Sequence, residues 1–403
     1  MDEWKEYKLG EACTELSDGL HKAPKFKLGG DYIFVNAKNI VNGFIVDNDP
    51  TKKSTYEEFL KYASPLNNTT VLYSIDGTIG NVALYRGEKC ILGKGACYLN
   101  PNPNVLDRMF LYYELQSPRF KGYIDRMSTG STIKHISLKT MRNYRFTFPS
   151  IERQRQISAI LKSLDDKIEV NRRINDNLEQ QAQALFKSWF VDFEPFKDGG
   201  FVESELGMIP KGWRVGLFIE NIDVMPGGTP STGNSEYWDG GTIPFFSPKD
   251  VNGVYCFETE KRITESGLNN CSSHLYPENT LFITARGTVG KICLTGVPMA
   301  MNQSNYALVA KEDVGKFYLY LLAQTLVRVL LKKSNGAVFS AITTRDFKEP
   351  TIMPPAYIMK KFEKIVSPLF KMIHRTSQES RRLASLRDTL LPKLMSGELK
   401  VNN

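Results

Sequence analysis

The strongest constraint in this sequence is an internal duplication. The run Gly77-Thr78-Ile79-Gly80 returns as Gly287-Thr288-Val289-Gly290, and a short apolar run precedes each copy. Other landmarks keep the same order, and their separation falls slowly from 211 residues, between Lys38 and Lys249, to 206 residues. Such a period is far longer than that of a solenoid and is typical of a duplicated domain. The sequence therefore predicts two similar domains that perform two similar tasks.

Composition narrows the class of protein. With 403 residues, 41% of them hydrophobic, the chain can bury two substantial cores. A net charge of +8 favours an anionic partner such as nucleic acid. The six cysteines lack the spacing of a zinc site, so we interpret them as reduced thiols. No apolar run approaches the roughly 20 residues of a membrane span and no signal peptide is recognisable, so a cytoplasmic protein is expected.

Patterns along the chain predict an α+β protein. Short apolar runs bounded by Gly, Asn and Asp indicate strands, and one helix is expected over residues 107–127. Residues 151–190 contain neither Gly nor Pro and predict a long helix. In order, the expected segments are a first strand-rich domain (1–149), a long helix (150–193), a polar linker (194–211), a second strand-rich domain (212–355), and a second long helix with a tail (356–403).

Both long helices carry a coiled-coil seam. Apolar residues alternate steps of three and four from Ile157 to Trp189, and a similar seam runs from Phe362 to Leu390. A narrow seam of this kind favours a partner helix, because a helix that faces a globular core usually carries a wider apolar stripe. The two helices are therefore expected to pair with each other.

Polar residues interrupt each seam near its middle and indicate how the helices pair. They are Asn171 and Asn175 in the first seam and Thr376 and Glu379 in the second. In an antiparallel pair with matched ends these residues meet, and buried polar residues fix the register of a coiled coil. We therefore predict antiparallel pairing; the alternative is that two polar patches coincide by chance.

Motifs of catalysis are absent. No Gly-x-Gly-x-x-Gly run follows a strand, and Gly93-Lys94-Gly95 lacks the spacing and the Ser or Thr of a phosphate-binding loop. Met353-Pro354-Pro355-Ala356 resembles the Asn-Pro-Pro-aromatic loop of amino-methyltransferases only superficially, because the polar and aromatic residues are missing. The four histidines have no companion groups in the sequence. We predict a non-catalytic protein with no cofactor and no metal.

The repeated features suit a binding module instead. Each Gly-Thr-x-Gly run is expected to form a tight turn between two strands, and the residue before it differs, Asp76 in one copy and Arg286 in the other. Lys and Arg pair with guanine or phosphate, Asn and Gln with adenine, and Asp with cytosine. These loops are thus candidates for contact with the base edges or phosphates of a nucleic acid, although each loop residue could equally be a solvated surface residue. The candidate DNA contacts are His21, Lys22, Lys25, Lys38, Asn39, Asp76, Thr78, Lys134, His135, Thr229, Ser231, Lys249, Asp250, Arg286, Thr288, Gln303 and Asn305.

Longer motifs follow in a fixed order along essentially the whole chain. They are Gly130-Ser131-Thr132-Ile133-Lys134-His135-Ile136, Pro149-x-x-Glu152-x-Gln154-x-x-Ile157, Glu205-Leu206-Gly207-x-Ile209-Pro210-x-Gly212-Trp213, Gly227-Gly228-Thr229-Pro230-Ser231 and Tyr237-Trp238-x-Gly-x-x-Ile243-Pro244-Phe245. The ordered set, together with the Gly-Thr-x-Gly turns, resembles the DNA specificity subunit of type I restriction-modification systems. This resemblance implies a non-catalytic subunit that binds double-stranded DNA and whose two target-recognition domains read the halves of a bipartite, asymmetric DNA site.

The resemblance also implies protein partners. The two long helices would act as a spacer and dock two methyltransferase subunits, and restriction and translocation subunits would join that core. Apolar residues that lie off the first seam are candidates for the docking surface, namely Ile160, Ile174 and Phe186.

The two predicted domains also differ from each other. The first shows no counterpart of the Gly227-Gly228-Thr229-Pro230 run, and Gly130-Ser131-Thr132-Ile133 is replaced by Gly336-Ala337-Val338-Phe339 in the second. Such differences are expected if the two half-sites differ. Two alternatives remain at this stage: a fragment of a fused restriction-methylation enzyme, and a coiled-coil adaptor that binds only proteins.

Overall fold

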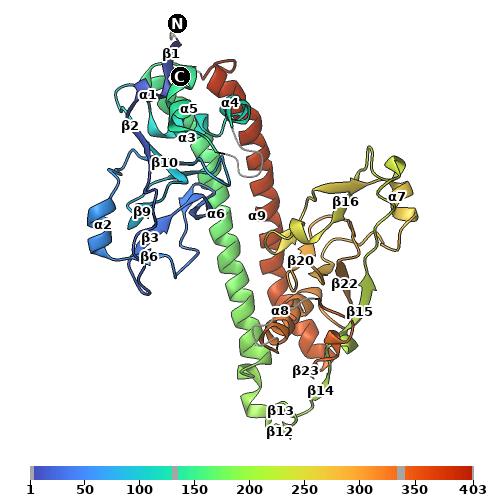
Figure 1. Ribbon diagram of the computed structural model, residues 1–403. Coiled ribbons are helices and arrows are strands. Elements are labelled where there is room, and N and C mark those ends of the chain that lie inside the picture. Colours follow the sequence, from blue (N-terminus) through green and yellow to red (C-terminus); the bar gives the residue numbers. More distant parts are fainter. Residues whose placement is uncertain (1–3, 129–134, 334–340, 402–403) are drawn as a thin grey trace. The chain divides into compact units, whose positions relative to one another are not determined.

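A computed structural model describes residues 4–128, 135–333 and 341–401 (Figure 1). The chain forms two compact units. Unit 1 comprises Met1–Ile168 with Arg382–Asn403, and unit 2 comprises Glu169–Arg381. Each unit contains its own strands, its own hydrophobic core and part of both long helices.

Unit 1 is built on a four-stranded antiparallel sheet of order β2-β10-β7-β8 and a three-stranded sheet of order β6-β3-β9, in which β3 and β9 run parallel. Two short ladders, β1-β11 and β4-β5, complete it. The strands are β1 (Lys5–Lys8), β2 (Cys13–Asp18), β3 (Tyr32–Val35), β4 (Ile40–Val41), β5 (Phe44–Ile45), β6 (Lys53–Ser54), β7 (Val71–Ser74), β8 (Val82–Leu84), β9 (Cys90–Leu92), β10 (Ala96–Pro101) and β11 (Arg145–Phe148). The short helices are α1 (Leu9–Ala12), η1 (Ala37–Asn39), α2 (Tyr56–Tyr62), α3 (Arg108–Glu114), α4 (Pro118–Met127) and α5 (Leu138–Asn143).

The single helix expected over residues 107–127 is in fact two helices, α3 and α4. Ser117 has an extended backbone and its hydroxyl accepts a hydrogen bond from the Phe120 N–H at 3.1 Å, which caps the start of α4. Pro118 occupies the first turn of α4, where a missing N–H costs nothing. The helical spacing of apolar residues continues across this break. For that reason the sequence pattern suggested one helix, although Ser117-Pro118 is a typical helix start.

Unit 2 repeats the two larger sheets. A five-stranded sheet has the order β15-β22-β19-β20-β17, and a three-stranded sheet has the order β18-β16-β21, with β16 and β21 parallel. Two ladders, β12-β13 and β14-β23, are added. The strands are β12 (Phe201–Ser204), β13 (Gly207–Pro210), β14 (Arg214–Leu217), β15 (Ile222–Pro226), β16 (Ile243–Phe246), β17 (Tyr255–Cys256), β18 (Lys261–Ile263), β19 (Leu281–Thr284), β20 (Ile292–Thr295), β21 (Ala300–Met301), β22 (Asn305–Ala310) and β23 (Pro350–Met353). The short helices are η2 (Glu194–Gly199), η3 (Phe218–Asn221), η4 (Ser235–Tyr237), η5 (Pro248–Asp250), α7 (Glu265–Asn269), α8 (Lys316–Lys333) and η6 (Asp346–Lys348).

The predicted duplication is therefore visible in the strand order. The series β2-β10-β7-β8 of unit 1 corresponds to β15-β22-β19-β20 of unit 2, and β6-β3-β9 corresponds to β18-β16-β21. In both units one strand pair of the smaller sheet is parallel and the other antiparallel. The α+β fold class is confirmed.

The two long helices are α6 (Ile151–Phe190) and α9 (Ala356–Ser396). In unit 1, Asp165 of α6 accepts a hydrogen bond from the Arg387 guanidinium of α9 at 2.7 Å. Leu161 and Leu394 are fully buried in the same core. The long helices thus belong to the core that carries the strands of this unit.

In unit 2 the predicted polar contact is present. The Asn171 amide donates to the Glu379 carboxylate at 2.8 Å, and the Thr376 hydroxyl donates to the Asn175 side-chain carbonyl. Asn171 is fully buried, so a shift of register would separate its amide from the Glu379 carboxylate at considerable cost. The prediction of antiparallel pairing with meeting polar residues is confirmed.

The stretch expected as a polar linker folds into η2 and the β12-β13 hairpin. Aromatic side chains hold it, because the Trp213 ring packs on those of Phe193 and Phe196 at 5.5 and 5.0 Å between centroids. Phe193 itself has a positive φ of 56°. These contacts join residues about 20 positions apart in the sequence, and local composition does not reveal them.

Candidate nucleic-acid interface

In unit 1 the loop between β9 and β10, Gly93-Lys94-Gly95, is the point at which several segments meet. The Gly93 N–H donates to the Val35 carbonyl at 2.8 Å, which ties the loop to the end of β3. The Lys94 N–H donates to the Leu20 carbonyl at 3.0 Å, just beyond the end of β2. The Ile75 N–H, just beyond the end of β7, donates to the Gly95 carbonyl at 3.1 Å. We call these joined segments, residues 19–22, 35–39, 75–80, 93–95 and 135–136, the unit 1 frame.

The turn of the frame with the Gly-Thr-x-Gly sequence needs its glycines. Gly77 and Gly80 have φ of +71° and +104°, a region in which side chains are strained. The Gly80 N–H donates to the Ser74 carbonyl at 3.2 Å and closes the turn. Asp76, at its base, forms a bridge with His135, and the Ile136 N–H donates to the Ile75 carbonyl at 2.9 Å.

Unit 2 forms the same arrangement around the loop Asn302-Gln303-Ser304. The Asn302 N–H donates to the Phe246 carbonyl at 2.9 Å, and the Ala285 N–H donates to the Ser304 carbonyl at 2.8 Å. The turn glycines, Gly287 and Gly290, again have positive φ, +78° and +81°. We call the joined segments, residues 227–230, 246–250, 285–290, 302–304 and 341–342, the unit 2 frame.

Several backbone hydrogen bonds recur at matching places in the two frames, and these fix which residues are equivalent. The bonds Gly93 to Val35, Ile75 to Gly95 and Ile136 to Ile75 match Asn302 to Phe246, Ala285 to Ser304 and Ile342 to Ala285. The equivalent pairs are His21 and Thr229, Lys38 and Lys249, Asn39 and Asp250, Asp76 and Arg286, Thr78 and Thr288, Lys94 and Gln303, and His135 and Ala341.

The missing counterpart of the Gly227-Gly228-Thr229-Pro230 run is found by this correspondence. The Leu20 N–H donates to the Leu92 carbonyl at 2.7 Å, as the Gly228 N–H donates to the Met301 carbonyl at 3.2 Å. Gly19 therefore stands in the place of Gly227. A Cβ on Gly19 would lie 2.2 Å from the Leu92 backbone, and a Cβ on Gly227 would lie 1.9 Å from the Asn302 carbonyl oxygen. Both units require glycine here, although the residues that follow differ.

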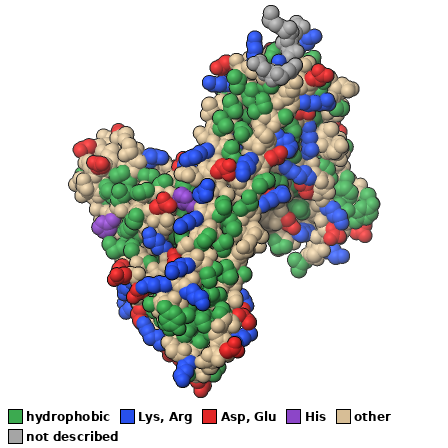
Figure 2. All heavy atoms as spheres, turned by 180° about the vertical axis from the view of Figure 1, so that it is seen from behind, with side chains coloured by type: hydrophobic (Ala, Val, Ile, Leu, Met, Phe, Trp, Pro, Cys, Tyr) green, Lys and Arg blue, Asp and Glu red, His purple; other side chains and the backbone are tan. Residues whose placement is uncertain are grey.

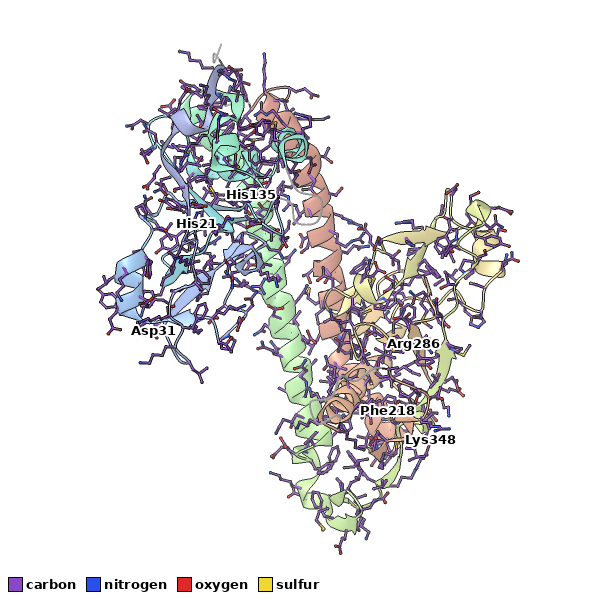
Figure 3. The ribbon with its side chains drawn as sticks, viewed as in Figure 1. His21, Asp31, His135, Phe218, Arg286 and Lys348 are labelled. Atoms are coloured by element: carbon purple, nitrogen blue, oxygen red, sulfur yellow. The ribbon has the colours of Figure 1, made fainter. Side chains whose placement is uncertain are left out.

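Most predicted contact residues lie on the frames with exposed or half-buried side chains. Figure 3 shows His21 and His135 in the same region of unit 1 and Arg286 in the strand-rich part of unit 2. The side chains at the exposed positions are those of His21, Lys22, Lys38, Thr78, Lys249, Arg286, Thr288 and Gln303, and the half-buried ones are those of Asp76, His135 and Thr229. Lys134 lies outside the described residues.

Three predicted contacts serve the frame itself. Asn39 is buried, and its side-chain carbonyl accepts a hydrogen bond from the Asn36 backbone N–H at 3.0 Å. The carboxylate of Asp250, its equivalent, accepts from the Ser247 N–H at 2.7 Å. Asn305 is buried, and its amide donates to Asn302 at 2.6 Å. These side chains hold the loops in place.

Two further predicted contacts lie outside the frames. The backbone of Lys25 is bonded to Glu58 and Ser54, beside β6 and α2. The carbonyl of Ser231 accepts from the Trp238 indole N–H at 3.0 Å, next to η4. Lys25 and Ser231 were predicted as contacts because they lie in loops rich in polar residues, but neither loop position belongs to a frame.

Lys94 is an exposed, charged frame residue that the sequence prediction missed. Its side chain is exposed, and among the described residues it has no hydrogen-bond or ion-pair partner. The signal was the Gly93-Lys94-Gly95 run, which fails as a phosphate-binding loop but places a lysine between two glycines.

Charge alone does not locate the interface. On the face drawn in Figure 2, Lys and Arg side chains are scattered among acidic and hydrophobic ones. The frames are distinguished by their geometry, since a rigid backbone arrangement presents different polar side chains in each unit.

Two features of the described residues bear on chemistry, their potential metal ligands and their thiols. In that part of the chain, no group of three or more His, Cys, Asp or Glu side chains could hold a metal ion. All six cysteines are free, and burial raises the pKa of the Cys13, Cys90 and Cys256 thiols to about 12, which keeps them protonated. None of the described helices has both the length and the apolar character needed to cross a membrane.

The three candidate docking residues of α6 differ in exposure. Ile174 is 38% exposed and lines a hollow of about 290 Å³ with Val170, Arg173, Asn177 and Leu178. Ile160 is half-buried against the unit 1 core. Phe186 is only 5% exposed and packs on Phe190, Tyr318 and Phe362, so in contrast to the prediction it belongs to the core of unit 2.

Comparison with known proteins gives a consistent result. The model of the type I restriction modification DNA specificity domain matches residues 1–180 and 212–386. The chain is 28% identical to the type I restriction enzyme MjaIX specificity subunit of Methanocaldococcus jannaschii, over 96% of this chain and 91% of that relative. It is 26% identical to the HindI specificity subunit of Haemophilus influenzae, over 99% of this chain and the whole relative.

A solved structure supports the fold. The S subunit of a type I restriction-modification system from M. genitalium is 18% identical, with a TM-score of 0.58, and the alignment covers 98% of this chain and 96% of that one. At this identity the likeness is evidence for the fold alone.

Proposed function

Since the chain belongs to the type I restriction-modification DNA specificity family, we propose that its two units each read one half of a bipartite, asymmetric DNA site. Its role is that of the specificity subunit, itself non-catalytic, in a complex with DNA and with modification and restriction subunits. The protein-only adaptor loses its basis, because the family model is that of a DNA specificity domain and the matching relatives are named specificity subunits.

A single observation carries the proposal: the same backbone frame occurs twice with different side chains. Frames of the same design bring equivalent positions to a DNA duplex in the same way, because matching hydrogen bonds hold the turn and the two neighbouring loops in both units. Asp76 and Arg286 occupy one such position, and their chemistry is opposite. A carboxylate accepts from cytosine, whereas a guanidinium donates to guanine. Two such frames on one chain would therefore recognise two different half-sites.

Replacement of Arg286 by Met tests this assignment. Arg286 is exposed, and within the described chain no ion pair or hydrogen bond occupies its guanidinium. The variant is expected to lose about tenfold or more of its base discrimination at one position, because a bidentate arginine contact contributes about 1–3 kcal/mol. The measurement is sequencing of methylated duplexes from a library with randomised half-sites, using the assembled complex.

Arg328→Met is the matched control, since Arg328 is an exposed arginine of α8 outside the frame. It should leave every base preference unchanged. If Arg286→Met altered both halves of the site, independent reading by the two units would be contradicted. If it altered neither half, the assignment of Arg286 to a base would be wrong.

For the protein partners, we propose that two methyltransferase subunits dock on the long helices and that the restriction subunits join through them. The apolar hollow around Ile174 supports this, because exposed apolar side chains on a long helix commonly mark a partner surface. We also propose that the protein acts in the cytoplasm, because its family role is in a complex with DNA.

Ile174→Asp should weaken co-purification of the methyltransferase by about tenfold or more, because the interface would have to bury an unpaired carboxylate. The fold should survive, since residue 174 is already 38% exposed. Leu60→Asp, on α2 with 61% exposure, is the control and should assemble normally. Equal assembly of both variants would remove the hollow from the docking surface.

A further inference from the structure

We propose that Lys94, at the tip of the β9-β10 loop, reads a base of the first half-site, and that Gln303 reads the equivalent base of the second. This inference rests on the proposed function and deepens it. It assigns separate tasks to the exposed frame positions, some to the DNA backbone and others to the bases.

The frame positions fall into two kinds. Lys38 and Lys249 are equivalent, exposed and identical in the two units. Lys94 and Gln303 are equally equivalent and exposed, yet their chemistry differs. Phosphate groups are the same in both half-sites, whereas bases differ. Positions that keep one residue therefore suit phosphate, and positions that change suit bases.

The loop holds Lys94 rigidly enough for base reading. The N–H groups of Gly93 and Lys94 both donate to neighbouring frame segments, and the Gly95 carbonyl accepts from a third. Gly93 has no room for a side chain, because a Cβ there would lie 2.4 Å from the Asn36 side-chain oxygen. Lys94 alone therefore projects from a loop whose backbone is fixed on both sides. A fixed backbone lowers the entropy lost on binding.

Gln303 projects from the corresponding loop in unit 2. Its side-chain carbonyl accepts a hydrogen bond from the Thr229 hydroxyl, and this orients the amide. The amide NH2 remains exposed for an acceptor such as N7 of adenine. In unit 1 the residue equivalent to Thr229 is His21, whose ring bonds to Asp18 at 3.1 Å. The ammonium of Lys94 remains available to the O6 and N7 acceptors of guanine.

The test compares the same substitution, Lys to Gln, at Lys94 and at Lys38. All variants are measured in the assembled complex with its methyltransferase. Lys94→Gln should lower the preference for guanine over adenine at one first-half position by about tenfold or more, with the second half unchanged. Lys94→Met should abolish the preference at that position. Lys38→Gln should weaken binding to every sequence alike and reduce the slope of log affinity against log salt by about one. The unchanged second half reports that each variant is folded and assembled.

Two results would overturn the inference. A uniform loss of affinity in Lys94→Gln, with a smaller salt slope, would assign Lys94 to phosphate. An unaltered base profile would show that Lys94 reads nothing. If the wild-type complex recognised no bipartite sequence, the proposed function would fail together with the inference. If the wild type recognised such a sequence and only the Lys94 variants behaved as described above, the inference alone would fail.

Discussion

Replacement of residues 1–149 by the corresponding segment of a relative with another target is expected to change one half of the methylated sequence and preserve the other. The reason is that the unit 1 frame depends on strands and loops of this segment for its hydrogen bonds. None of the frame bonds that define the unit 2 positions involves it. The effect should be complete at the exchanged half, because every base-reading position of that half is replaced together.

The junction has to preserve the contacts between the exchanged segment and α6. The Gln154 amide donates to the carbonyls of Val105 and Pro149 at 2.9 Å, and the Tyr113 hydroxyl donates to the Asp165 carboxylate at 2.8 Å. A donor segment that supplies a Tyr at position 113 is the suitable choice, and one that lacks it is the stability control. Change in both halves of the site would contradict the modular account.

Removal of one heptad from each long helix is expected to shorten the unread spacer of the DNA site by about three base pairs. We propose that these helices set the distance between the half-sites. Seven residues correspond to about 10 Å of helix at 1.5 Å per residue. With one base pair per about 3.4 Å, this is about three base pairs. The measurement is the spacer preference of the variant complex on duplexes with graded spacers.

Residues 162–168 and 383–389 are matched deletions, because Asp165 and Arg387 lie opposite each other in the antiparallel pair. The first deletion also removes the acceptor of the Tyr113 hydroxyl, so the variant carries Tyr113→Phe as well. A seven-residue deletion keeps the seam on the same helix face. The control removes five residues from each helix, which turns the seam by about 140° at about 100° per residue and should disrupt pairing. An assembled seven-residue variant that retained the original spacer preference would show that the helices do not set the distance.

The features that the sequence predicted well are those carried by periodicity or by repeated glycines. The seam from Ile157 to Trp189 predicted α6, and the polar residues Asn171 and Glu379 predicted the register that the structure contains. Gly77 and Gly287 predicted equivalent turns, since few other residues adopt positive φ there. Such signals are local, so they can be recognised without knowledge of the fold.

The features that were missed depend on contacts distant in the sequence. Gly19 is equivalent to Gly227, but only hydrogen bonds across the sheets reveal this, because the neighbouring residues differ. Asn39 is of a residue type that often contacts DNA, yet its side chain is buried and accepts a hydrogen bond from the loop backbone. Phe186 lies off the coiled-coil seam and is nevertheless covered by Tyr318 of α8. Residue type therefore pointed to the loops that form the frames. Only the burial seen in the structure shows which of their side chains can contact DNA.

The central claim is that one chain reads two different half-sites, and mapping of methylated bases across the genome tests it most directly. The comparison is between cells that contain the chain and otherwise identical cells that lack it. The account predicts one chain-dependent motif made of two different short sequences separated by a spacer of fixed length and arbitrary sequence. A contiguous motif, two identical halves, or the same methylation in cells without the chain would contradict it.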